Sequence, residues 1–156
     1  MYSLAPFTRM AIFIAVVDQI TKLIVVHAMN LKEVSTILIY QPYVLFRMAW
    51  NTGINFGIPL ANRWVLIALA VLICLWIMWW MMRDRPSLWI QLSAGMVIGG
   101  AVGNVIDRLV YGAVADFLNV SCCGYENPYS FNVADIAIFA GALGLIFLSN
   151  GEGERR

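Results

Sequence analysis

Residues 64–82 read WVLIALAVLICLWIMWWMM, an apolar run without a charged side chain. A bilayer core requires about 20 mostly apolar residues per helix, so this run predicts a transmembrane helix. Three more segments have a similar composition, and we expect them to span the bilayer at about 10–29, 88–106 and 131–148. The predicted fold class is therefore an all-α membrane protein, with four transmembrane helices in a single polytopic domain over residues 1–156.

The composition of the whole chain agrees with a lipid environment. Of its 156 residues 62% are hydrophobic, and a soluble protein of this size has too little interior to bury so much apolar surface. The net charge is only +1, so nucleic acid is not an expected partner. His27 is the only histidine and no Cys-x-x-Cys motif is present, so we expect no metal site.

The first apolar segment has an alternative interpretation as a cleavable signal peptide, since Arg9 precedes it. However, Asp18 and Lys22 interrupt its apolar stretch, and no small-x-small cleavage site follows. We therefore interpret it as a transmembrane helix.

Basic residues indicate the orientation of the chain. With four spans both termini lie on one side of the membrane, and basic residues are denser on that side than in the outer loops, 30–63 and 107–130. We therefore expect cytoplasmic termini. The residues compared are Arg9, Arg83, Arg85, Arg155 and Arg156 on the inner side, and Lys32, Arg47, Arg63 and Arg108 on the outer side.

The first outer loop contains a predicted β-hairpin. Residues 37–50, ILIYQPYVLFRMAW, are rich in β-branched and aromatic types, with Pro42 at the expected turn. The aromatic side chains of such a hairpin suit the lipid headgroup level.

Small residues and cysteines give two further expectations. Gly95, Gly99 and Gly103 recur every four residues, which predicts close helix packing, and Gly141 and Gly144 predict the same for the last helix. A disulfide between the neighbours Cys122 and Cys123 is geometrically unfavourable, so we do not expect one.

Polar side chains gather toward the outer ends of the predicted helices. A charge inside a span costs at least about 2.5 kcal/mol on insertion scales, so such residues usually face the bundle interior and mark a functional site. Spacings of three and four residues place the members of each group on one helix face. The groups are Asp18 with Lys22, Asn104 with Asp107 and Arg108, and Asn132 with Asp135, while Asp116 follows in the second outer loop.

Several of these residues also fit purely structural roles. Asp18 and Lys22 fit a structural ion pair, Asn104 a tie between helices, and Asn132 a helix N-cap. Asp107 and Arg108 also fit ordinary helix-end charges, and nothing in the sequence decides between the structural and the functional role.

Asp116 and Asp135 are harder to explain structurally, because each lies in an apolar stretch without a basic neighbour. Two adjacent carboxyl groups cannot both ionise easily, so one keeps a proton. The ionised group then activates water, and the protonated group polarises the scissile carbonyl and protonates the leaving amine. No serine or cysteine nucleophile has a plausible base, since His27 stands alone. The residues therefore point to hydrolysis by an aspartic pair.

Five short motifs follow one another along the chain and extend over residues 18–135, which is most of its length. The motifs are DQITK at 18–22, NTGINFG at 51–57, GGAVGNVIDR at 99–108, GAVADF at 112–117 and FNVAD at 131–135. In sequence and order they resemble the motifs of the bacterial prolipoprotein signal peptidases (signal peptidase II).

The resemblance implies an intramembrane aspartic endopeptidase that needs no cofactor. This family removes the signal peptide from diacylglyceryl-modified prolipoproteins, cleaving before the lipidated cysteine. The resemblance also implies a small extracytoplasmic β-cradle in the first outer loop, which agrees with the predicted hairpin. It further implies a multi-pass protein of the bacterial plasma membrane, in contact with membrane lipid, with its site on the extracytoplasmic side. We expect a monomer. Asp116 and Asp135 match the catalytic positions, and the matched supporting positions are Asp18, Lys22, Asn51, Asn104, Asp107, Arg108 and Asn132.

Two departures and two rival functions remain at this point. Asn55 stands where the second motif commonly has a small residue, and the loop at 121–127 matches no motif and is expected to influence substrate clamping. A proton-coupled transporter also places carboxyl groups in a membrane, but no inverted repeat is visible. A membrane scaffold would use the same polar residues only to hold helices together.

Overall fold

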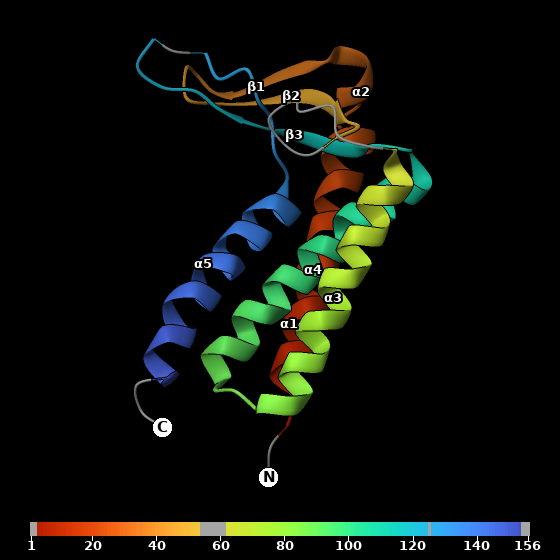
Figure 1. Cartoon of the computed structure of the whole chain (residues 1–156). Helices are drawn as coiled ribbons and strands as arrows, with labels where there is room; N and C mark the ends of the chain where they lie inside the picture. The colour runs from red at the N-terminus through yellow and green to blue at the C-terminus, as the bar shows by residue number, and fades with distance from the viewer. Residues whose placement is uncertain (1–2, 54–61, 125, 154–156) are drawn as a thin grey trace.

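The computed structural model describes residues 3–53, 62–124 and 126–153 of the chain. Helices form a bundle, a small sheet lies across one end of it, and both chain termini lie at the opposite end (Figure 1). The long helices are α1 (Ala5–Lys22), which continues as the π-helix η1 (Leu23–Ala28), α3 (Arg63–Asp84), α4 (Leu88–Val110) and α5 (Val133–Gly153).

Three helical segments within the described residues are long and apolar enough to cross a membrane: Ala5–Ala28, Arg63–Asp84 and Leu88–Val110. The apolar part of α5, Val133–Ser149, is shorter. On α3 only Leu66, Ile77 and Met81 are buried, and most other large apolar side chains are exposed, as expected for a lipid-facing helix. The fold is thus that of a helical membrane protein, and the fourth span remains a prediction.

Helix α4 occupies the centre of the bundle, between α1 and α5. A Cβ atom added at Gly99 would lie 2.5 Å from the carbonyl oxygen of Ala11 on α1, and one at Gly141 on α5 would lie 2.6 Å from that of Ser93. The glycines therefore permit the close helix packing that their spacing predicted.

The sheet contains three antiparallel strands in the order β1-β2-β3: β1 (Thr36–Tyr40), β2 (Val44–Asn51) and β3 (Val114–Val120). Strands β1 and β2 form the expected hairpin, and the short helix α2 (Leu31–Val34) precedes it. Strand β3 differs from the sequence prediction, which places all of 107–130 in a loop. It pairs with β2 at the edge of the sheet and thereby places Asp116 opposite Ala49.

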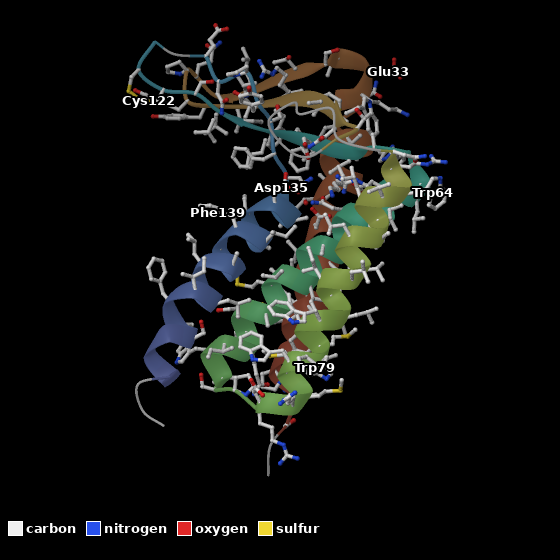
Figure 2. All side chains as sticks on the ribbon, viewed as in Figure 1. Glu33, Trp64, Trp79, Cys122, Asp135 and Phe139 are labelled. Carbon is white, nitrogen blue, oxygen red and sulfur yellow. A yellow bond between two sulfur atoms is a disulfide. The ribbon has the colours of Figure 1, made fainter. Side chains whose placement is uncertain are left out.

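The loop after β3 corrects a second expectation, because Cys122 and Cys123 form a disulfide. The chain reverses direction here, with φ of +60° at Cys123 and +80° at Gly124. The two cysteine side chains therefore do not alternate as they would in an extended strand. Cys122 lies at the end of the sheet remote from Asp135 (Figure 2).

Candidate active site

Asp116 lies on β3 and is almost completely buried, with 2% of its surface exposed. Its Oδ1 accepts a hydrogen bond of 2.7 Å from the side-chain amide of Asn132, and its Oδ2 accepts one of 3.0 Å from the amide of Asn51. Asn51 is the last residue of β2, so pairing of β2 with β3 brings its amide to this carboxyl group. Asn51 at the end of β2 and Asn132 just before α5 thus hold the Asp116 side chain.

Asp135 lies in the first turn of α5, at the end of this helix that faces the sheet (Figure 2). The side-chain oxygen of Asn132 accepts from the backbone N–H of Asp135 at 2.9 Å, and Oδ2 of Asp135 accepts from the backbone N–H of Asn132 at 3.3 Å. This reciprocal pair is a capping box, with Asn132 as the N-cap residue. The N-cap role considered from the sequence therefore coexists with a contact to Asp116.

Amide groups connect the two carboxyl groups. Nδ2 of Asn104 donates to Oδ1 of Asp135 at 3.0 Å, and Oδ1 of Asn104 accepts from Nδ2 of Asn132 at 3.3 Å. Since Asn132 also donates to Asp116, a continuous path runs from Asp116 through Asn132 and Asn104 to Asp135. This path fixes both carboxyl groups relative to each other.

The environment of Asp116 favours its neutral form. Burial, followed by the charge of Asp135, raises the pKa of Asp116 to about 7, although the hydrogen bonds from Asn51 and Asn132 act in the opposite direction. A carboxyl group of this pKa can hold a proton at neutral pH, which is what a general acid requires.

Arg108 connects α4 to the chain that leaves the hairpin. Its guanidinium donates to the carbonyl oxygen of Gly53 at 2.9 Å and to that of Asn104 at 3.3 Å. The residue therefore does more than end a helix: it holds the strand-end segment that carries Asn51 next to the site. Asn55, the departure in the second motif, lies outside the described residues.

Asp18, Lys22 and Asp107 form a second buried group, called here the ion cluster. Nζ of Lys22 lies 2.7 Å from Oδ2 of Asp18 and 2.8 Å from Oδ2 of Asp107, and both carboxylates are fully buried. Gln19 also contacts both carboxylates and was missed from the sequence. The signal available for it was an amide side chain inside an apolar span, adjacent to Asp18.

A cavity of about 500 Å³ lies beside Asp135. Helices α3, α4 and α5 all contribute to it, and its lining is apolar except at the end that contains Asn104, Arg108 and Asp135. Such a cavity suits an apolar chain whose polar end is presented to Asp135. In the described part of the chain no cluster of three potential metal ligands occurs.

The chain is similar to known proteins along most of its length. The family model described as signal peptidase (SPase) II matches residues 10–150. A lipoprotein signal peptidase of Methylobacterium sp. (strain 4-46) is 38% identical over 135 residues, which cover 84% of this chain and 80% of that protein. A lipoprotein signal peptidase of Symbiobacterium thermophilum is 40% identical over 141 residues, with coverage of 89% and 90%.

Solved structures share the fold. A bacterial membrane enzyme determined by the in meso method at 2.3 Å resolution superposes with a TM-score of 0.85, covering 99% of this chain and 93% of that one at 24% identity. A second bacterial membrane enzyme, determined at 1.9 Å resolution, gives a TM-score of 0.80 at 25% identity and 94% coverage of both chains.

Proposed function

The chain belongs to the signal peptidase II family, and we propose that it removes the signal peptide from prolipoproteins with Asp116 and Asp135 as its catalytic pair. Membership in this family makes it an aspartic protease. The observation that carries the residue assignment is the path of amide hydrogen bonds from Asp116 through Asn132 and Asn104 to Asp135. Membership in the family is what separates this function from that of a transporter or a scaffold.

The pair activates water for attack on the scissile carbonyl. One carboxylate accepts a proton from the water, and the protonated partner donates a hydrogen bond to the carbonyl oxygen and later protonates the leaving amine. The raised pKa of Asp116 supports a shared proton at neutral pH. The surrounding asparagines contribute by fixing each carboxyl group, since an amide donor orients a carboxylate without adding charge.

The substrate we propose is a prolipoprotein carrying a diacylglyceryl-modified cysteine. The apolar cavity between α3 and α5 leads to Asp135 and matches an acyl chain or the apolar part of a signal peptide. The sheet lies opposite both termini, so the cytoplasmic termini that the basic residues predict would place the site on the extracytoplasmic side, with α5 as the fourth span (Figure 1). This places cleavage at the outer boundary of a bacterial plasma membrane.

Cleavage by the purified protein tests the function directly. In detergent, with nothing else added, we expect a diacylated prolipoprotein to be converted to a shorter product on a gel, because the two carboxyl groups supply both the base and the acid. A chelator such as EDTA should leave the rate unchanged. A transporter or a scaffold would give no product above the enzyme-free control, and activity that EDTA abolished and zinc restored would contradict the aspartic mechanism.

The pH dependence follows from the pKa of Asp116, about 7. We expect kcat/KM to fall as the pH rises above about 7, because the pair loses its shared proton, and to fall in acid, where both groups are protonated. Asn51→Ala removes a hydrogen bond that favours the charged form of Asp116, so the alkaline limb should move to higher pH.

A variant that keeps every hydrogen bond of the two carboxyl groups provides the control for this experiment. Ser130→Ala removes a hydrogen bond to the carbonyl oxygen of Arg47 and should leave the pH profile in place. An alkaline limb that stays fixed or moves to lower pH in Asn51→Ala would contradict the assignment of Asp116.

A further inference from the structure

Gln19 provides a second link between the two carboxylates of the ion cluster, Asp18 and Asp107. Its Nε2 donates to Oδ2 of Asp18 at 3.1 Å and to Oδ1 of Asp107 at 3.0 Å. Lys22 and Gln19 thus each contact both carboxylates, so the relative position of Asp18 on α1 and Asp107 on α4 is fixed twice. A single salt bridge between two helices would not require the second connection.

Each carboxylate of the cluster also accepts one backbone hydrogen bond from a different element. Oδ2 of Asp107 accepts from the N–H of Ala115 on β3 at 3.0 Å, and Oδ1 of Asp18 accepts from the N–H of Ala134 on α5 at 2.9 Å. Ala115 immediately precedes Asp116, and Ala134 immediately precedes Asp135. The two bonds therefore end on the two backbone positions next to the proposed catalytic pair.

We propose that Asp18, Lys22, Gln19 and Asp107 are positioning residues that set the separation of Asp116 and Asp135, by holding the backbone one residue before each of them. This inference rests on the proposed function of the pair. A cluster that only stabilised the bundle would need to connect α1 with α4. Here the same carboxylates continue to β3 and α5, the two elements that must be kept in register for both carboxyl groups to reach one substrate bond.

The packing of Gly103 supports this role. A Cβ atom added at Gly103 would lie 2.5 Å from Oδ2 of Asp18. That oxygen is already held by Lys22 and Gln19, so it has little freedom to move away. A methyl group at this position would therefore displace the Asp18 carboxylate and, through Ala134, the start of α5.

Two variants of Asp107 separate positioning from charge. Asp107→Asn and Asp107→Leu have the same charge and nearly the same size, but only asparagine keeps an oxygen that accepts from both Lys22 and Ala115. We expect Asp107→Leu to lower kcat per folded molecule by about a hundredfold, as a misplacement near 1 Å can cause, with KM changed less than about threefold. Asp107→Asn should retain kcat within about tenfold of the wild type.

A second pair of variants tests the Asp18 side and remains decisive if Asp107→Leu does not fold. Gly103→Ala should lower kcat, whereas Gly95→Ala overpacks the same helix pair against Phe7 and Met10, far from the cluster, and should lower only the melting temperature. Equal kcat per folded molecule within either pair would overturn the proposal. The wild-type enzyme would still cleave prolipoprotein in that case, so this failure is distinct from failure of the proposed function.

Discussion

Replacing either Asp116 or Asp135 by asparagine is expected to reduce cleavage of a diacylated prolipoprotein by at least about a thousandfold, the scale of loss when a member of a catalytic group is removed. Each role requires a carboxyl group that can gain and lose a proton, and an amide can do neither. The asparagine side chain has nearly the same shape, and its oxygen can still accept the hydrogen bond from Asn132 or Asn104. Both variants should therefore insert and fold.

The melting temperature in detergent, measured together with the cleavage rate, shows whether activity is lost through the chemical step or through unfolding. Asp84→Asn is a matched control, since it makes the same substitution at the C-terminal end of α3, far from the sheet (Figure 1). The Asp84 side chain is 44% exposed. This variant should keep full activity. Substantial turnover by purified Asp116→Asn or Asp135→Asn would refute the assignment of the catalytic pair.

The elements that hold the site differ in how well the sequence predicts them. The hairpin and the close helix packing follow from local patterns, namely β-branched residues around Pro42 and glycines four residues apart. Strand β3 does not show such a pattern, because Val114–Phe117 are all buried and their side chains do not alternate between core and solvent. Its pairing partner, β2, lies more than sixty residues earlier.

The sequence also predicts polar contacts within one helix better than contacts between distant segments. Asp18 and Lys22 are four residues apart on one helix, so their ion pair was a local prediction. Asp107 was considered with its neighbour Arg108 as a helix-end charge, but it pairs instead with Lys22 on another helix. Only the packing of α1 against α4 creates that contact, and the sequence contains no local signal for it. The bonds to the backbone of Ala115 and Ala134 are hidden for the same reason.

The second large effect concerns the lipid on the substrate. Asp135 of the proposed catalytic pair lies where α5 meets the sheet (Figure 2), beside the apolar cavity lined by α3, α4 and α5. In our proposal this is the outer boundary of the membrane. A peptide must hold its scissile bond at that depth while the pair reacts. Moving an acyl chain out of lipid costs about 0.8 kcal/mol per CH₂, so two chains strongly oppose any displacement of the cysteine toward water.

Without its acyl chains, the same peptide can slide along the membrane normal, and the scissile bond spends little time in reach of Asp116 and Asp135. We therefore expect an unlipidated prolipoprotein to be cleaved at least about a hundredfold more slowly than its diacylated form, since loss of orientation alone has effects of this size. The comparison requires one detergent, matched substrate concentrations and an identical peptide sequence. A substrate with a single acyl chain should fall between the two, because it opposes displacement about half as strongly. Equal rates for all three would mean that the site recognises peptide alone, and cleavage before a lipidated cysteine would no longer explain the cavity beside Asp135.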